Sequence, residues 1–161
     1  MEFNIEKVCC FTGHRPEKCK GTEEEIRARL ATEIQNAIGE GYNTFITGMA
    51  PGVDTWAADE VLKIKSENKE IKLIAAVPFP GVEKNRTAEL QDHFKAIIGK
   101  TDDVQYVYRK YRRWVFHARD AWMVDHESRV LAVFNRSPGG TEWTINYAKM
   151  KNCEIVFIVD E

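Results

Sequence analysis

One stretch decides how this chain is interpreted: VLAVFNRSPGGTEWTINYA, residues 130–148. Its first five residues are apolar, as in a buried strand, and the residues after Gly139 and Gly140 have a helical pattern. A strand that ends in glycines and continues as a helix leaves unpaired backbone N–H groups at the positive end of the helix dipole. Glycine also lets a ligand approach the backbone and allows φ above zero in the turn. The stretch predicts an anion-binding loop or, as the alternative, a tight turn without a ligand.

Two earlier loops have the same character. The apolar run at 8–11 ends in TGHRP (12–16), and the run at 44–46 ends in TGMAPGVD (47–54). If the three strands are parallel neighbours, the three loops share the edge of the sheet where open α/β folds bind ligands. The loop PFPG (78–81) follows another apolar run, and we expect it at the same edge. This edge is therefore the expected functional region.

Composition sets the class of protein. The chain has 161 residues, with 23 Lys and Arg against 25 Asp and Glu, so a net charge of -2 gives no bulk attraction to nucleic acid or to an anionic membrane. No signal peptide or membrane-spanning apolar run is present. The cysteines lack CxxC spacing, which favours reduced thiols over a disulfide framework: Cys9, Cys10, Cys19 and Cys153. We expect one cytoplasmic domain over residues 1–161, without membrane association, metal site or cofactor.

Apolar runs typical of strands alternate with amphipathic stretches typical of helices. Thr22 and Glu25 form a capping-box pattern ahead of a helix of about 17 residues that ends near Gly39. This alternation predicts a single Rossmann-like three-layer α/β domain with a mainly parallel sheet and helices on both faces. The expected strands are 7–11, 42–47, 71–77, 104–107, 130–134 and 155–159, and the further helices are 54–64, 85–98, 116–126 and the stretch from the Gly-Gly turn to about residue 150.

The loops carry cationic and hydroxyl groups suited to a phosphorylated ligand. Arg15 lies two residues past Gly13 and can complete a phosphate site opened by loop amides; the alternative is a surface salt bridge. His14 can serve as an acid or a phosphate donor, or play no part. Hydroxyl groups at strand ends can donate to phosphate or ribose oxygens, or cap helices: Thr12, Thr47 and Thr141.

Three carboxylates are candidates for chemistry. Glu142 lies in the first turn of a predicted helix, where it can cap, accept hydrogen bonds from ribose hydroxyls, or act in N-glycosidic cleavage. Asp54 has the same alternatives: helix N-cap, sugar ligand or second catalytic carboxylate. Asp125 lies near the C-terminal end of its helix, where a carboxylate opposes the dipole. That position indicates a functional role or, alternatively, a salt bridge to Arg129.

The segment YRKYRRW (108–114) alternates aromatic and basic residues. Aromatics that stack bases beside cations that hold phosphates are typical of single-strand binding; the alternative is a surface loop whose aromatics cover the core. The GxGxxG fingerprint of dinucleotide folds is absent after the first strand, and no Walker-type loop is present. These absences argue against an NAD dehydrogenase and against ATP hydrolysis.

Four motifs in order resemble the SLOG superfamily, and more narrowly its YpsA-like group of small bacterial proteins, catalogued as a domain of unknown function: TGHRP (12–16), GMAPGVD (48–54) with Ala57 and Ala58, Arg119 with Met123-Val124-Asp125, and GGT (139–141). The second motif is similar to the GxAxGxD signature of DprA (Smf) proteins, which bind single-stranded DNA. The last is similar to the PGGxGTxxE signature of LOG enzymes, which hydrolyse the N-glycosidic bond of nucleoside 5′-monophosphates. The resemblance implies that Gly139, Gly140 and Thr141 hold a phosphate, that Arg15 contacts it or the sugar, and that Glu142 approximates the enzymes' glutamate, although the motif here is shorter.

The leading hypothesis is a sensor or regulatory protein that binds a nucleotide or nucleotide-derived ribose phosphate. The alternatives are a LOG-like hydrolase that uses Glu142 or Asp54, and DprA-like binding of single-stranded DNA. A homo-oligomer is compatible with the fold class. The expected ligand-binding residues are Thr12, Gly13, His14, Arg15, Thr47, Gly48, Gly52, Asp54, Pro78, Arg119, Asp125, Gly139, Gly140, Thr141 and Glu142.

Overall fold

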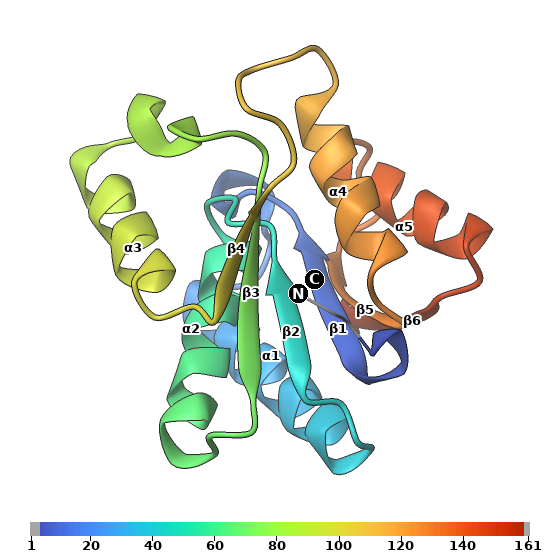
Figure 1. Cartoon of the computed structure of the whole chain (residues 1–161). Coiled ribbons are helices and arrows are strands. Elements are labelled where there is room, and N and C mark those ends of the chain that lie inside the picture. The colour runs from blue at the N-terminus through green and yellow to red at the C-terminus, as the bar shows by residue number, and fades with distance from the viewer. Residues whose placement is uncertain (1–3, 160–161) are drawn as a thin grey trace.

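A computed structural model describes residues 4–159. Within this range the chain forms a six-stranded parallel sheet with the order β4-β3-β2-β1-β5-β6 (Figure 1). The strands are β1 (Val8–Gly13), β2 (Thr44–Thr47), β3 (Lys72–Val77), β4 (Asp103–Tyr106), β5 (Arg129–Phe134) and β6 (Glu154–Val159). The helices are α1 (Glu23–Gly39), α2 (Val53–Glu67), α3 (Ala88–Ile98), α4 (Val115–Asp125) and α5 (Gly140–Met150), with short 3-10 helices at Ile5–Lys7, Pro16–Lys18 and Val82–Asn85. In this range no helix has the length and apolar character needed to cross a membrane.

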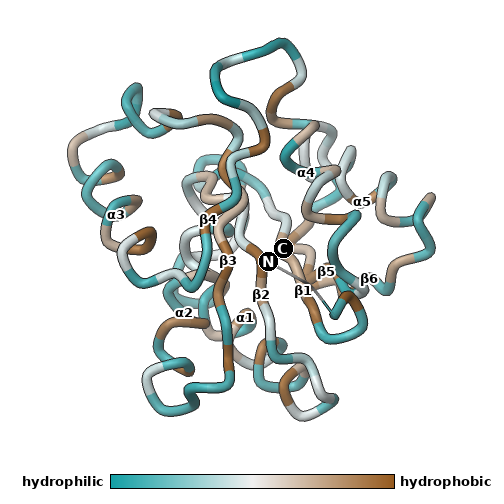
Figure 2. Tube along the Cα trace, viewed as in Figure 1, coloured by the Kyte–Doolittle hydropathy of each residue, from teal (hydrophilic) through white to brown (hydrophobic). Residues whose placement is uncertain are grey.

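The sheet lies between two layers of helices (Figure 1). Helices α1, α2 and α3 pack on one face, and α4 and α5 pack on the other. Cys9 and Cys10 are buried in opposite cores because successive strand residues point to opposite faces. Hydrophobic residues gather along the central strands, whereas the outer loops are mainly hydrophilic (Figure 2). The predicted Rossmann-like three-layer architecture is confirmed.

The strand order places the three Gly-containing loops side by side. β1 pairs with β2 on one side and with β5 on the other, so the loops after these strands leave the sheet at neighbouring points of one edge. The chain runs outward from β1 to β4 and then crosses to β5, which makes the β1–β5 boundary a topological switch point. In open α/β sheets, ligands bind in the crevice outside the carboxyl ends of the strands at such a point.

Local sequence chemistry explains the start of α1. The Thr22 hydroxyl accepts a hydrogen bond from the Glu25 N–H at 3.1 Å, and the Glu25 carboxylate accepts one from the Thr22 N–H at 3.4 Å. This capping box satisfies two amides that the helix itself leaves unpaired. Leu30 and Ile34 then lie on the buried side of the helix, one turn apart.

The prediction of one helix over 85–98 is wrong at its start. A 3-10 turn ends at Asn85, Arg86 is extended, and Thr87 caps α3 by accepting a hydrogen bond from the Leu90 N–H at 3.3 Å. Thr87 acts as the N-cap because its hydroxyl binds a backbone N–H, so the helix begins at Ala88, three residues after the predicted start. The predicted strand over 42–47 likewise begins at Thr44. The first correction leaves Arg86 in the loop at the carboxyl edge of the sheet.

We expect Gly13→Ala to lower the free energy of unfolding by about 1–3 kcal/mol, the usual cost of overpacking. An added Cβ at Gly13 would lie 2.5 Å from the Cβ of Val53, the first residue of α2, so the strand end and the helix start cannot keep their distance. Gly39→Ala is the matched control, because a Cβ there meets nothing within 4 Å. Urea denaturation measures both variants. Equal midpoints for the two would contradict the close packing of α2 on β1.

Candidate functional site

Backbone and side-chain contacts join the loop after β1 to the loop after β5. The Asn135 N–H donates to Nε2 of His14 at 3.0 Å, and the Asn135 side-chain amide donates to the Lys18 carbonyl at 2.8 Å. The loop after β2 meets the same region, since an added Cβ at Gly52, where φ is 99°, would lie 2.8 Å from the Pro16 ring. The three loops therefore form one continuous rim, as the sequence predicts.

The N-terminal end of α5 is an exposed part of this rim. Gly139, at φ 140°, is the N-cap residue, and no side chain caps the helix there. Gly140 is exposed, and the space where its Cβ would lie is empty to 4 Å. Thr141 is buried and Glu142 is half-buried behind it. The first amides of α5 thus face a space where a ligand atom can come close to the backbone.

A buried charge cluster lies beneath the rim, between α2 and α4. The Arg119 guanidinium donates from Nη1 to the Gly48 carbonyl at 2.7 Å and from Nε to the Asp120 carboxylate at 2.7 Å. Asp120 also accepts a hydrogen bond from the Thr144 hydroxyl at 3.1 Å, which connects the cluster to α5. The predicted site residue Arg119 is therefore held by the loop after β2 and by its neighbour Asp120, which in turn binds α5.

Asp54 completes the cluster. Its carboxylate accepts a hydrogen bond from the Ala50 N–H at 3.3 Å. Burial raises the pKa of Asp54 to about 6; the positive charge of Arg119 lowers it, and the negative charge of Asp120 adds to the rise. An added Cβ at Gly48 would lie 2.7 Å from the Asp54 carboxylate and 3.0 Å from the Arg119 side chain, so a larger residue here would displace the charge cluster.

Several predicted ligand residues hold the loops together. The Thr47 hydroxyl is fully buried, donates to the Asp54 carbonyl at 2.9 Å and accepts from the Met49 N–H at 3.2 Å. His14 is 5% exposed, and its Nε2 accepts the Asn135 hydrogen bond. Because Nε2 is occupied, it cannot also donate to a phosphate. Thr12 is buried near the end of β1.

The predicted ligand residue Asp125 lies at the opposite end of the molecule. It is the last residue of α4, accepts a hydrogen bond from the Tyr147 hydroxyl at 2.8 Å and lies 3.8 Å from the Lys151 ammonium. The alternative of a salt bridge to Arg129 is wrong, because Arg129 pairs with Glu40 and Glu154. The unfavourable helix-dipole position of Asp125 is offset by these local partners, so it does not indicate a ligand site.

Two arginines lie at the rim, of which the sequence analysis predicted only one as a site residue. Arg15 is exposed, and among the described residues no acidic group pairs with it. Arg86 is half-buried with its guanidinium 5.4 Å from the Phe94 ring centroid, and burial and the charge of Arg119 lower its pKa. Sequence reasoning missed Arg86 by placing it inside a helix. Thr87 as an N-cap was the pattern that could have shown its loop position.

Pro78 occupies the fourth expected loop. Its ring is buried, and its carbonyl accepts a hydrogen bond from the Tyr108 N–H at 3.0 Å. The loop after β3 and the segment after β4 therefore leave the same edge of the sheet in contact. Pro78 fixes this contact through its backbone.

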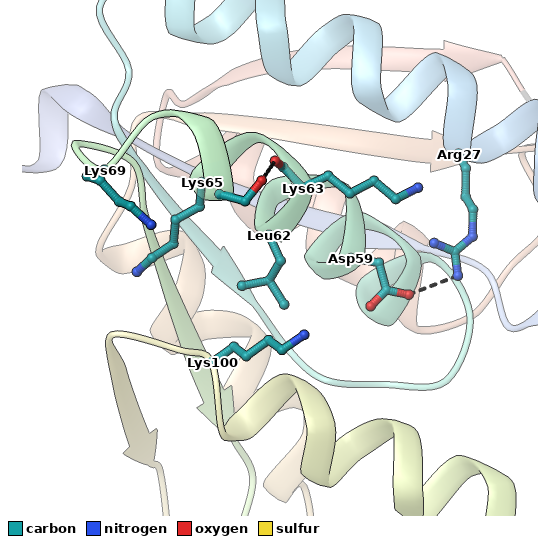
Figure 3. A pocket seen from close by; sticks show the side chains of 8 residues that line it. Arg27, Asp59, Leu62, Lys63, Lys65, Lys69 and Lys100 are labelled. Carbon is teal, nitrogen blue, oxygen red and sulfur yellow. Dashed lines mark hydrogen bonds and ion pairs between the residues drawn. The ribbon is translucent and has the colours of Figure 1, made fainter.

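One cavity lies away from the rim. It has a volume of about 600 Å³ and opens between α1, α2 and the loops that precede β3 and β4 (Figure 3). Its lining is mainly basic: Arg27, Asp59, Leu62, Lys63, Lys65, Ser66, Lys69 and Lys100. No predicted site residue lines it, so the candidate site is an open sheet edge rather than an enclosed cavity. Across residues 4–159 no cluster of three or more His, Cys, Asp or Glu side chains could hold a metal ion.

A parallel Rossmann-like sheet with Gly-containing loops at its switch point defines the general class of α/β proteins that bind ligands at the carboxyl edge. Within this class the chain belongs to the YspA SLOG family, whose model matches residues 9–158. The motif resemblance found in the sequence is thereby confirmed.

Relatives extend the comparison. A UPF0398 protein of Bacillus cereus is 25% identical over 154 residues, covering 90% of this chain and 84% of the relative. A UPF0398 protein of Brevibacillus brevis is 26% identical over 118 residues, covering 72% of this chain and 63% of the relative. Among solved structures, DNA processing protein A (DprA) from Streptococcus pneumoniae superposes with a TM-score of 0.65 at 15% identity, covering 95% of this chain and 50% of that one. The chain thus spans half the length of that DprA, and the likeness is one of fold.

Proposed function

We propose that this protein binds a nucleotide or a nucleotide-derived ribose phosphate at the carboxyl edge of its sheet and acts as a sensor or regulator. The observation that carries the proposal is the convergence of three Gly-containing loops at the switch point, where the α5 amides lack a side-chain cap beside the open Gly140. Phosphate groups bind such helix ends because amide donors and the helix dipole both favour negative charge.

The surrounding groups suit the rest of such a ligand. Arg15 supplies an exposed guanidinium in the loop after β1, between His14 and Lys18, which both contact Asn135. A guanidinium can hold phosphate oxygens in a bidentate way. Glu142, half-buried in the first turn of α5, is available to accept hydrogen bonds from ribose hydroxyls. The DprA fold likeness supports a nucleotide-related role, since that relative is a DNA processing protein.

Hydrolysis of the N-glycosidic bond is a second candidate, and the state of Asp54 favours it. A buried carboxyl with a pKa of about 6 exchanges its proton near neutral pH, which suits a general acid or base. Glu142 would be the second carboxylate. Binding and hydrolysis would both place the phosphate at the N-terminal amides of α5 beside Gly139 and Gly140, here called the phosphate seat.

We expect at least one compound from a panel of nucleoside mono- and diphosphates, ADP-ribose and NAD to raise the melting temperature by several degrees. At a concentration one hundred times the dissociation constant, binding stabilises the fold by about 2.7 kcal/mol. The Arg15→Ala, Gly140→Asp double variant should lose the shift, because it removes a cation and places a carboxylate at the phosphate seat. Lys69→Ala, an exposed cation at the distant basic cavity, is the control and should keep it.

The proposal fails if no compound shifts the wild type more than the double variant. The same mixtures, analysed for free base, separate binding from hydrolysis. Base release that disappears in Glu142→Gln would establish the hydrolase. If the wild type releases no base, the hydrolase is excluded and the binding function remains.

A further inference from the structure

The segment over residues 107–114, here called the aromatic arm, rises from the carboxyl edge of the sheet between β4 and α4 (Figure 1). Its base is fixed to β3: the Val107 N–H donates to the Val77 carbonyl at 2.9 Å, and the Tyr108 N–H donates to the Pro78 carbonyl at 3.0 Å. The arm therefore lies at the same sheet edge as the proposed site, and backbone hydrogen bonds hold its base in place.

The arm exposes large rings to solvent. Tyr111 is 66% exposed and Trp114 is 64% exposed, and Phe116, just beyond the arm, is 46% exposed. The alternative that these aromatics cover the core is therefore wrong for Tyr111 and Trp114. Trp114 also has φ 66° and ψ 14°, a left-handed conformation that is an outlier for a bulky residue. Exposed aromatic surface held by an unfavourable backbone is typical of a binding surface.

One row of rings connects the arm to the buried charge cluster. The Arg119 guanidinium lies 5.8 Å from the Phe116 centroid, and Phe116 contacts Phe79 edge-on at 6.5 Å. Phe79 in turn contacts Tyr111 edge-on at 5.9 Å. Ring contacts thus connect the exposed Tyr111 to Arg119, the side chain that binds the loop after β2.

A second row connects the arm to the proposed phosphate seat. The Trp114 ring stacks on His117 at 5.5 Å, and His117 stacks on Trp143 at 4.4 Å with an angle of 3° between the planes. Trp143 lies in the first turn of α5, whose amides form the seat. Stacked rings therefore connect the aromatic arm to the phosphate seat.

The arm also places cations over its rings. The Arg112 guanidinium lies 5.0 Å from the Tyr108 centroid, and that of Arg113 lies 5.2 Å from the Trp114 centroid. Aromatic faces beside arginines are the groups that stack planar bases while compensating phosphate charge. These groups would be poorly matched to a bare sugar phosphate, which has no planar face to stack.

We infer that the aromatic arm is a base-stacking subsite, and that the ligand of the sheet edge is a free nucleotide whose base lies against Tyr111 or Trp114 while its phosphate lies at α5. This inference rests on the proposed function and deepens it, since it selects ligands that retain a base over ribose phosphates that lack one. A single-stranded nucleic acid presents the same chemistry, and the test separates the two sources.

The test compares AMP with ribose 5-phosphate by isothermal titration calorimetry. The wild type should bind AMP about tenfold more tightly, the effect expected for one stacked base. The Tyr111→Ala, Trp114→Ala double variant should lose that advantage and bind ribose 5-phosphate as the wild type does. The Tyr111→Phe, Trp114→Phe variant keeps aromatic faces and should retain most of the preference. Phe157→Ala, an exposed ring on the far edge strand β6, is the control and should change neither affinity.

The outcomes separate the two proposals. If the wild type binds both compounds equally and the alanine variant does the same, the stacking subsite is overturned while the phosphate seat stands. If the wild type binds neither compound, this inference is overturned, whereas the proposed function fails only if the whole melting-temperature panel also shows no binding. Tyr111→Ala alone, at the most exposed ring, gives the answer if the double variant does not fold. Oligothymidylate binding that weakens steeply with salt and depends on the two rings, without AMP binding, would overturn the free nucleotide as the ligand.

Discussion

We expect Arg119→Met to lower the free energy of unfolding by about 3–5 kcal/mol at pH 7.5, the usual cost of removing one partner from a buried charged group. Arg119 is 7% exposed and compensates two buried carboxylates, Asp120 directly and Asp54 through its charge. Burial alone would lower the pKa of Arg119, but these carboxylates outweigh it and raise it. Methionine fills similar space without a charge, so it leaves both carboxylates uncompensated.

The pH dependence distinguishes this cause from loss of packing. Asp54 has a pKa of about 6 in the wild type, and removal of Arg119 should raise it further because the positive charge that lowers it is gone. The deficit of the variant should therefore shrink as the pH falls from the raised pKa of Asp54 toward 6, because below 6 Asp54 is neutral in both proteins. Urea denaturation at pH 5 and 7.5 measures it, with the exposed Arg109→Met as control. A deficit that is the same at both pH values would indicate lost packing instead.

The second large effect concerns Glu127, at the end of the sheet opposite the candidate site. Its side chain is 3% exposed, and neither carboxylate oxygen has a hydrogen-bond partner among the described residues. Burial raises the pKa of Glu127 to about 8, with a partial opposing effect from the nearby Cys153 thiol. At neutral pH the folded protein therefore carries this group protonated, while the unfolded chain ionises it.

The sign of the pH effect follows from that difference. Since the folded pKa exceeds the unfolded value of 4.5, the stability is fully present below pH 4.5 and falls as the pH rises toward 8. The fall is about 1.4 kcal/mol for each pH unit within this window. Glu127→Gln keeps the shape and removes the titration, so the variant should match the wild type near pH 4.5 and exceed it by several kcal/mol at pH 8.

Urea denaturation between pH 4.5 and 8 tests this expectation. Glu17→Gln, the same change at an exposed position, is the control and should leave the pH profile of the wild type intact. If Glu127→Gln and the wild type show parallel profiles, then Glu127 does not titrate across this window and its burial is compensated by another group.

Much of the fold could be predicted because its determinants are local. The capping box of Thr22 and the apolar stripe that follows it specify α1, and the apolar runs specify the strands of the sheet. The failures were also local: Thr87 begins α3 later than hydrophobic periodicity indicates, because the periodicity does not register a side chain that binds the backbone.

The sequence predicted the location of the candidate site more accurately than the roles of its individual side chains. Gly13, Gly48 and Gly140 lie in loops that meet at one edge, as parallel pairing requires. The sequence did not separate side chains that face a ligand from those that hold the loops. His14 and Thr47 proved to be internal links, Asp125 lies at the far end, and Arg86 was missed.

By itself the sequence determined the order of strands and helices, and with it the edge where the glycine loops emerge, because hydrophobic period and capping act between near neighbours in the chain. Only the tertiary structure decided which groups are available for binding, since exposure and hydrogen bonding depend on distant segments. His14 meets Asn135 from 121 positions away, and Arg119 meets Gly48 from 71 positions away. No local pattern specifies such partners, because the folded sheet creates them.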